Sequence, residues 1–414
     1  MGSRTYHDPL HGAIRLDRGQ PAEALAIALI DTPPFQRLRR IRQLGPAYLT
    51  FHGAESSRFT HSLGVLDLAR RALRELCRFR PELEQHAGLL LAAALLPLSH
   101  SGEEMYGLHH ESWSARLIRE HSSLREPLER YAPGTAEAVA DLLEHGRSPC
   151  PAIKALVSSQ LDCDRLDYLL RDSYSTGTSY GQLDLERILS SLTLAPDGSL
   201  ALHPKGLMAV EHYLVVRNLM YRSVYNHRLN VVCNWLLSRC IAVARQLGPE
   251  RVWADAVMQR WLWHPQALSV EQFLGNDDHR TGYHLQRWKE EAPSELQELC
   301  ARLLDRRLLK ASDVSRLSRE RRLELLALAQ RLSEQAGLKG DLCCGLQSQQ
   351  NRGYHPYRGG LRLWDGQQLT ALEQRSRLVS SLSTPSESAW LIHPPEVAGP
   401  LRQQLALETS GEGS

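Results

Sequence analysis

The sequence predicts a mainly α-helical protein with a small α+β region near its C-terminus. Apolar residues recur at helical spacing through most of the first 340 residues, as at Leu63, Leu66 and Leu73. Beyond about residue 340 the pattern changes to short extended segments separated by Gly and Pro, as in YHPYRGGLRLWDG. We therefore expect a helical core at residues 1–245, a helical extension at 246–338, an α+β region at 339–408 and a disordered tail at 409–414.

The composition is that of an ordinary globular chain and argues against several classes of protein. Apolar residues make up 42% and charged residues 23% of the 414 residues, which is enough for a large core. The net charge of +2 gives no general basic field of the kind that marks a nucleic-acid-binding protein. We expect no membrane span and no secretory signal, and the eight cysteines show no zinc-type spacing. These features favour a cytoplasmic protein with reduced thiols.

The N-terminal part begins with turn chemistry and continues as two helices. Residues 1–20 contain the turn sequence HDPLHG, and helices are expected at 21–31 and 34–44, separated by Pro33 and Pro34. The second helix is rich in arginine, which is typical of a solvated basic face and also of a phosphate contact. These arginines are Arg37, Arg39, Arg40 and Arg42.

A helix follows the sequence RFTHS, and His61 lies at its start. Thr60 or Ser62 is a candidate N-cap. A histidine in this position is more often a capping or packing residue than a ligand. The next helix, at 82–96, ends in a run of Leu and Ala and is followed by a cluster of imidazoles and carboxylates that could serve metal or acid–base chemistry. That cluster contains His100, Glu103, Glu104, His109, His110 and Glu111.

The stretch SSQLDCDRLDYLLRDSYSTGTSYG is the most informative part of the chain. From Cys163 onward it predicts a helix on which Asp164, Asp167, Tyr168 and Arg171 share one face. Such a face is typical either of one wall of a polar site or of a surface helix with internal ion pairs. The pattern alone does not distinguish the two.

A second polar and aromatic stripe lies on a long helix expected at about 207–247. It suggests a ligand wall, although a helix–helix interface would show the same pattern. The stripe consists of Arg217, Tyr221, Tyr225 and Arg228. The remaining expected elements are helices at 111–121, 134–145 and 151–160, a β-hairpin at 192–202, further helices at 250–304, a basic linker at 305–320 and a helix at 320–337.

Several of these segments, in this order, resemble one protein family. The segments are DTPPFQRLRRIRQLGPAYLTFHGAESSRFTHS, LDCDRLDYLLRD and VRNLMYRSVYNHR. Together they resemble the HD-domain phosphohydrolases, and most closely the dNTP triphosphohydrolases, which include bacterial dGTPase-like proteins and the mammalian SAM-and-HD-domain enzyme. The resemblance is strong over residues 5–230 and weaker beyond. It implies an HD-type helical bundle that hydrolyses a dNTP to a deoxynucleoside and triphosphate.

The resemblance also implies roles for individual residues. His61 and Asp164 match ligands of a divalent metal such as Mn, Mg, Fe or Zn, which would polarise a phosphate and activate water. His100 and His110 match catalytic-pocket histidines near the phosphates. Arg58, Arg217 and Arg228 match residues near the triphosphate, Gln43 and Tyr225 match deoxyribose contacts, and Tyr168 and Asp172 match further nucleotide contacts. Asp31, Gln36 and Arg39 match an allosteric site for an activating guanine nucleotide, GTP or dGTP, at subunit contacts.

The chain departs from the family in one place. The family's central motif is approximately His-Asp-hydrophobic-Gly-His-Gly, whereas here Leu96 is followed directly by Pro97-Leu98-Ser99-His100. About six residues are absent between matching flanks, and with them the His-Asp pair that supplies two metal ligands. His100, Glu103 or His110 could substitute, or the gap could be an engineered change or an error in the coding DNA.

We therefore expect a dNTP triphosphohydrolase by ancestry whose metal site is incomplete and whose turnover is severely impaired. The alternative is a non-catalytic dNTP-binding regulatory homologue that keeps the Arg and Tyr pocket. A third hypothesis is a single-stranded nucleic-acid-binding protein that uses the basic segments at 37–42 and 305–322, against which the near-neutral charge argues. The resemblance further implies a homo-oligomer, with residues 21–44 as a candidate contact.

Overall fold

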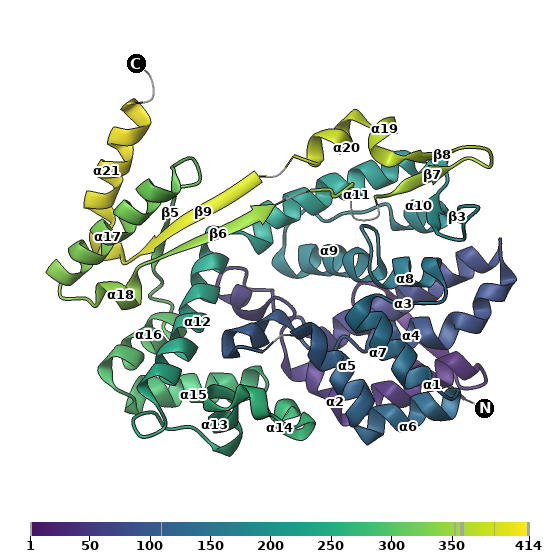
Figure 1. Cartoon of the computed structure of the whole chain (residues 1–414), viewed down its shortest axis with the longest axis horizontal. Helices are drawn as coiled ribbons and strands as arrows, with labels where there is room; N and C mark the ends of the chain where they lie inside the picture. Colours follow the sequence, from purple (N-terminus) through teal and green to yellow (C-terminus); the bar gives the residue numbers. More distant parts are fainter. Residues whose placement is uncertain (1, 109, 352, 357–359, 385, 412–414) are drawn as a thin grey trace. The chain divides into compact units, whose positions relative to one another are not determined.

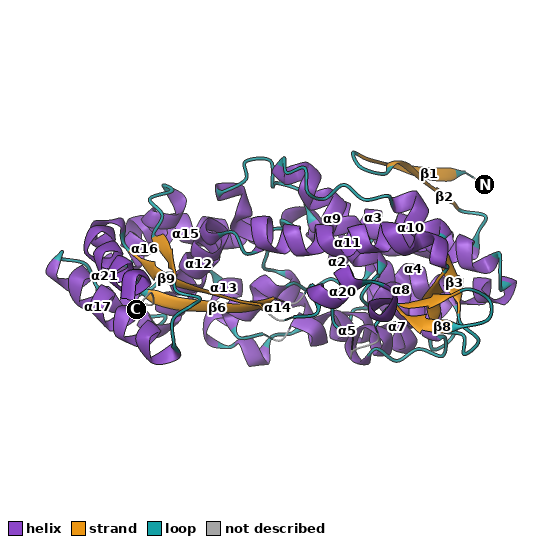
Figure 2. Cartoon of the chain, turned by 90° about the horizontal axis from the view of Figure 1, so that it is seen from above, coloured by secondary structure: helices purple, strands orange, loops and turns teal. Residues whose placement is uncertain are grey.

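Helices make up most of the chain, and the strands form three small sheets within the described residues (Figure 2). The mainly α-helical fold with a small strand-containing C-terminal region is therefore confirmed. None of the described helices is both long and apolar enough to cross a membrane. The computed structural model describes residues 2–108, 110–351, 353–356, 360–384 and 386–411, apart from the side chains of 101, 110–111, 350–351, 386 and 406–411 (Figure 1).

The chain divides into two compact units, each built from segments that are not contiguous in sequence. The domain boundaries expected from the sequence stay a prediction. The first unit contains the described residues of 1–220, 265–279 and 352–384, and the second contains those of 221–264, 280–351 and 385–411.

The first unit is organised around α3 (Arg58–Cys77), which packs against α4 (Ala87–Leu95) and α9 (Cys163–Thr176). The sequence of α4 is AGLLLAAAL and nearly all of its residues are buried, so it forms the centre of this core. The other helices of the unit are α1 (Pro21–Ile30), α2 (Pro33–Arg37), α5 (His110–Glu120), α6 (Ser122–Tyr131), α7 (Thr135–His145), α8 (Pro151–Val157), α10 (Leu185–Ser190), α11 (Leu207–Met220), α14 (Val270–Leu274), α19 (Leu372–Arg375) and α20 (Arg377–Leu382).

Two small sheets belong to the first unit. The N-terminal strands form an antiparallel hairpin around the HDPLHG turn. The hairpin expected at 192–202 is confirmed, and one of its strands pairs in parallel with a strand from the C-terminal third of the chain, Leu202 lying opposite Leu363. The strands are β1 (Ser3–Asp8) and β2 (Gly12–Asp17), and, in sheet order, β3 (Leu192–Leu194), β4 (Leu200–Leu202), β7 (Arg362–Trp364) and β8 (Leu369–Ala371).

The second unit combines helices with a three-stranded antiparallel sheet. Its helix α12 (Arg228–Leu247) packs against α16 (Ser294–Leu304). The expectation of a basic linker at 305–320 was wrong, because β5 (Lys310–Asp313) pairs with β9 (Ser386–His393) between the buried residues Leu309 and Val314. The other elements are α13 (Ala256–Trp263), most of α15 (Asp278–Glu291), α17 (Arg319–Gln335), α18 (Gly340–Cys343), β6 (Gly345–Asn351) and α21 (Ala398–Gly411).

Two expected helices are shorter than the sequence pattern indicated. The helix expected at 34–44 ends after α2 and a short 3₁₀ turn, because Arg42 adopts an extended conformation and pairs with Ser57. The long helix expected at 207–247 is interrupted by a π-helical turn at Tyr221–Tyr225. Such turns are rare and are frequent at functional sites.

Candidate functional site

The start of α3 is placed by a short extended pairing with the segment before it. Gln43 N–H donates to Ser56 O at 2.8 Å, and Arg58 N–H donates to Ile41 O at 2.9 Å. The cap of α3 is Ser57, which accepts from Thr60 N–H, so the expectation that Thr60 or Ser62 caps this helix was wrong. This pairing places Gln43 and Arg58, two of the predicted substrate-binding residues, on adjacent segments of backbone.

Gln43 and Arg58 each have a buried polar atom that makes no hydrogen bond within the described part of the chain. These atoms are Gln43 Oε1 and Arg58 Nε. Burial lowers the pKa of Arg58, although the nearby carboxylate of Asp164 opposes that effect. A buried polar group without a partner costs free energy, which a ligand or a water molecule recovers by bonding to it.

His61 lies between two carboxylates of α9. Its Nε2 is 2.8 Å from Asp164 Oδ1 and its Nδ1 is 2.8 Å from Asp167 Oδ2. Asp164 and Asp167 are three residues apart and lie on one helix face, as the spacing predicted. Asp162 caps α9 by accepting from Arg165 N–H, and Gly177 ends it with φ of 72°. The structure thus brings together His61 and Asp164, the two predicted metal ligands.

Asp167 is the centre of a buried ionic network that reaches the N-terminal hairpin. It accepts from His11 Nε2 at 2.6 Å and from Arg171 Nε and Nη2 at 2.7 and 2.9 Å. Arg171 Nη1 also donates to Asp8 Oδ2 at 3.0 Å. A Cβ on Gly64 would lie 1.9 Å from Asp167 Oδ1, so only glycine leaves room for the network at this point of α3.

Sequence reasoning missed the contribution of Asp8 and His11. The available signal was the HDPLHG turn, in which Asp8 Oδ1 accepts from the N–H groups of Leu10 and His11 at 2.9 Å. These bonds fix the turn that carries both side chains to Arg171 and Asp167. Asp167 in turn binds Nδ1 of His61, and a carboxylate in that position fixes the orientation of the imidazole ring.

The two carboxylates keep His61 protonated at neutral pH. Burial alone would lower the pKa of His61, but its hydrogen bonds to Asp164 and Asp167 outweigh burial and raise that pKa to about 9. The same contacts with His61, together with those from His11 and Arg171, hold the pKa of Asp167 well below its usual value despite burial. His61 is therefore an imidazolium, with each ring nitrogen donating to a carboxylate.

We expect the free energy of unfolding to fall as pH rises through about 9. The pKa of His61 is raised above its unfolded value of 6.5, so its contribution is complete below pH 6.5 and is lost as His61 deprotonates in the folded protein. The change amounts to about 3 kcal/mol. Urea titrations between pH 6 and pH 10 measure it, with His61→Gln as the control. An identical pH profile for both proteins would contradict the assignment.

The residues present do not fit a complete metal centre. Within the described residues, no group of three or more His, Cys, Asp or Glu side chains is placed to hold a metal ion. The predicted ligands His61 and Asp164 hydrogen-bond to each other in this structure. Two donors fall short of the three or four protein ligands of a typical catalytic or structural zinc site.

Several residues of the loop after α4 are held by hydrogen bonds and an ion pair. Leu98 and Ser99 are buried, and their N–H groups donate to Ser114 Oγ at 3.0 and 3.2 Å. Glu103, a possible substitute ligand, is buried and ion-paired with Arg37 at 3.3 Å. His100 Nδ1 accepts from Gly102 N–H at 3.0 Å. His110 begins α5, but its side chain is outside the described part of the structure.

Arg37 belongs neither to a solvated basic face nor to a free phosphate site, whereas Arg39 and Arg40 are exposed. Arg37 is 2% exposed and donates to the backbone of Asn276 and Leu98 as well as to Glu103, so the expectation of an exposed arginine was wrong there. Arg40 pairs with Asp277 at 2.5 Å and Arg42 with Glu55 at 2.6 Å. These ion pairs also weaken the hypothesis of a nucleic-acid-binding segment at 37–42.

The other predicted substrate-binding residues fall in both units. In the first unit, Arg217 and Asp172 are buried, Tyr168 is half-buried, and Arg217 Nη1 donates to Gln160 Oε1 at 3.0 Å. In the second unit, Arg228 begins α12 and the ring of Tyr225 lies 5.1 Å from that of Tyr221. Their roles toward a substrate stay predictions.

Of the three predicted allosteric residues, Asp31 caps the C-terminus of α1, Gln36 lies in α2, and Arg39 lies in the 3₁₀ turn Leu38–Arg40. Asp31 forms an ion pair with Arg4 of the N-terminal hairpin. Arg39 Nε donates to Gln36 Oε1 at 2.8 Å, and its guanidinium lies 3.6 Å from the ring centre of Phe59. Gln36 and Arg39 are therefore adjacent, and their proposed binding of an activator is untested.

Comparison with known proteins identifies the family. The family model described as "HD associated region" matches residues 183–393, which is just over half of the chain. The protein YwfO of Bacillus subtilis is 36% identical over 315 residues, covering 74% of this chain and 71% of YwfO. Deoxynucleoside triphosphate triphosphohydrolase SAMHD1 of Gallus gallus is 27% identical over 286 residues, covering 58% of this chain. The chain spans 45% of that enzyme's length and about half the length of several other curated relatives.

A solved structure supports the same assignment. The crystal structure of a phosphohydrolase from Bacteroides thetaiotaomicron superposes with a TM-score of 0.82 at 25% sequence identity, covering 95% of this chain and all of the other. The fold, the match to the HD-associated region and the relationship to YwfO agree. The chain therefore belongs to the HD-domain phosphohydrolase family.

Proposed function

We propose that this protein descends from dNTP triphosphohydrolases, which release a deoxynucleoside and triphosphate, and that in the present chain this hydrolysis is severely impaired. The ancestry is supported by the relationship to an enzyme named deoxynucleoside triphosphate triphosphohydrolase. The impairment is supported by one observation above all. Leu96 at the end of α4 is followed directly by Pro97, without a His-Asp pair, and within the described residues no group of three or more His, Cys, Asp or Glu side chains is placed to hold a metal ion.

In this proposal the chain retains much of the nucleotide-binding wall. Arg58 and Arg217 of the first unit bind the triphosphate. Gln43 contacts the deoxyribose, and the remaining predicted contacts in the first unit are made by Tyr168, Asp172 and the pocket histidines His100 and His110. The buried Gln43 Oε1 and Arg58 Nε, which have no partner in the described part of the chain, are suited to this task.

The test is a turnover assay of the purified protein with dGTP and each of the other dNTPs, with and without Mn²⁺ or Mg²⁺. We expect triphosphate release at or near the rate of a control without enzyme. Release typical of a metallohydrolase, in the range of about 1 per second or more, would contradict the impairment. The variant Asp164→Ala is the control for a contaminating hydrolase, because activity that survives this change does not come from the site.

The second candidate function is binding of a dNTP without hydrolysis, as in a regulatory homologue. The same unpartnered atoms of Gln43 and Arg58 favour it, because binding needs the polar wall and no metal. Isothermal titration with dGTP measures the affinity, and Arg58→Gln should weaken it about tenfold or more. Absence of binding to every dNTP would remove this candidate.

A further inference from the structure

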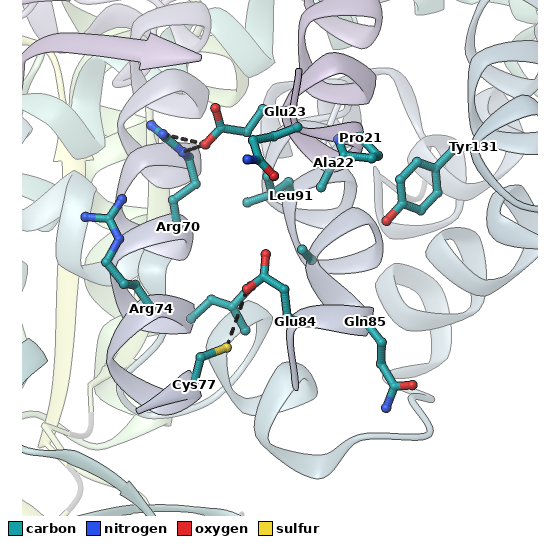
Figure 3. Close-up of a pocket in the computed structure, with 13 residues that line it drawn as sticks. Pro21, Ala22, Glu23, Arg70, Arg74, Cys77, Glu84, Gln85, Leu91 and Tyr131 are labelled. Carbon is teal, nitrogen blue, oxygen red and sulfur yellow. Dashed lines mark hydrogen bonds and ion pairs between the residues drawn. The ribbon is translucent and has the colours of Figure 1, made fainter. Parts of the chain in front are cut away.

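A cavity of about 540 Å³ lies in the first unit at the end of α3 that is remote from His61. It is formed by the start of α1, the last two turns of α3, the 3₁₀ turn Pro81–His86, α4 and the end of α6 (Figure 3). His61 and Arg74 are 13 residues apart on the same helix, which is about 20 Å of helix rise. The cavity is therefore separate from the candidate site and independent of the proposed function.

One arginine of this cavity, Arg74, forms no ion pair within the described part of the chain. Arg70 Nε donates to Glu23 Oε1 at 2.8 Å, and Glu23 Oε2 also accepts from Asp17 N–H, so the charges of Arg70 and Glu23 balance each other. Arg74, one turn further along α3, is exposed, and its guanidinium makes no hydrogen bond or ion pair among the described residues. Figure 3 shows both guanidinium groups projecting from the same side of α3.

The second carboxylate of the lining, that of Glu84, accepts a hydrogen bond from a thiol. Glu84 Oε2 accepts from Cys77 Sγ at 3.6 Å, and no ion pair joins Glu84 to Arg74 in the described structure. The start of α1 also contributes positive potential, because the side chain of Gln20 does not cap the helix. The guanidinium of Arg74 is therefore available to an anionic ligand, because neither glutamate of the lining pairs with it in the described structure.

Part of the cavity wall is apolar, and Gln20 and Gln85 also line it. Leu73, Ala87 and Leu91 contribute aliphatic surface, and the ring of Tyr131 closes one side (Figure 3). This ring lies directly on the backbone of α4, since a Cβ on Gly88 would be 2.3 Å from two of its atoms. Glycine at that position keeps the aromatic wall against the cavity.

We propose that this cavity binds a small organic anion, with Arg74 holding the anionic group while Leu73, Leu91 and the ring of Tyr131 cover an aromatic or aliphatic body. The volume lies within the range of about 300–1,000 Å³ that is usual for small-molecule sites, and the combination of apolar surface with a few placed polar groups is typical of them. A carboxylate and a phosphate monoester both satisfy a guanidinium, and the experiment below distinguishes them.

Cys77 provides a reporter inside the cavity. It is half-buried, whereas the other seven cysteines are buried, so a thiol reagent modifies it first. Burial and the neighbouring Glu84 raise the pKa of Cys77 to about 11, so alkylation by iodoacetamide is slow enough to time. We expect benzoate or phenyl phosphate to slow this alkylation in a saturable way, with a dissociation constant on the order of 1 mM for so small a ligand.

Matched variants assign the protection to Arg74. Arg74→Gln should raise the probe concentration needed for half-maximal protection of Cys77 about tenfold or more, because a charge-assisted hydrogen bond is lost. Arg71→Gln is the control. Arg71 lies between Arg70 and Arg74 on α3, but it pairs with Glu186 and does not line the cavity. Cys77→Ser confirms that the signal comes from Cys77.

The probes decide the chemistry. Stronger protection by benzoate identifies a carboxylate site, and stronger protection by phenyl phosphate identifies a phosphate site. Equal protection by benzyl alcohol would overturn the requirement for an anion. Equal protection by inorganic phosphate would overturn the requirement for an apolar body, and absence of protection by any probe up to about 10 mM would overturn the site.

Discussion

Insertion of His-Asp-Ile-Gly-His-Gly between Leu96 and Pro97 is expected to raise metal-dependent hydrolysis of dGTP more than about 100-fold above that of the unmodified chain. The insert returns a histidine and an aspartate to the end of α4, which packs against α3, the helix that carries His61. A completed site binds the metal more tightly, and a bound metal supplies several kcal/mol of transition-state stabilisation. A factor of 100 corresponds to about 3 kcal/mol.

The loop that follows the insertion point favours this outcome. Leu98 and Ser99 are held by Ser114, and Arg37 donates to Leu98 O at 3.3 Å, so the downstream flank stays anchored while the insert forms a new turn. The control variant carries Ala-Ala in place of the inserted His-Asp pair, with the same length. Turnover in the presence of Mn²⁺ is the first measurement, and the Mn²⁺ affinity of each variant is the second. Equal rates for the two variants would refute the missing pair as the cause of impairment.

Metal binding by the insertion variant should be strongly pH-dependent. His61 must lose its proton before it can bind a metal, and the pKa of His61 is about 9. Metal binding therefore competes with one proton below that pH, and the affinity rises with pH until His61 is neutral.

Replacement of Asp167 by alanine is expected to lower the free energy of unfolding by about 3–5 kcal/mol. The side chain of Asp167 is fully buried and holds His11, His61 and Arg171. Its removal leaves these cationic or donor groups buried without their shared acceptor, which costs far more than the loss of an exposed ion pair. Urea denaturation followed by circular dichroism measures the change.

Asp164→Ala is the matched control, because Asp164 lies three residues earlier on the same face of α9. Its side chain is 47% exposed, so water replaces part of what His61 loses, and we expect a change of about 1–2 kcal/mol, smaller than for Asp167. An equal loss in the free energy of unfolding for the two variants would contradict the stabilising role of the buried network around Asp167.

The sequence predicted the local parts of the site well. The spacing of Asp164, Asp167 and Arg171 placed them on one helix face, because helical geometry alone determines which residues share a face. The resemblance to the HD-domain family brought His61 and Asp164 together, and the structure places them 2.8 Å apart. Periodicity also located most helices of the core.

The remaining features depend on contacts between distant residues, which local patterns do not contain. Asp167 lies 156 residues from His11 in sequence. Arg37 is buried because Glu103 and the backbone of Asn276 receive its guanidinium, and nothing near Arg37 in the sequence indicates this. The helix α6 was not predicted at all and contains Pro127, a residue that normally argues against a helix interior.

The link between the N-terminal turn and α9 also sets an order of events during synthesis. Asp8 and His11 emerge from the ribosome early, but Asp167 and Arg171 follow about 160 residues later. At about 5–20 residues per second, this interval lasts on the order of 10–30 s. Throughout it the two N-terminal side chains remain hydrated and the hairpin lacks its anchor. A nascent chain that stops before α9 will therefore hold this hairpin by its strand pairing and by contacts such as the Arg4–Asp31 ion pair, without the buried bonds to Asp167 and Arg171.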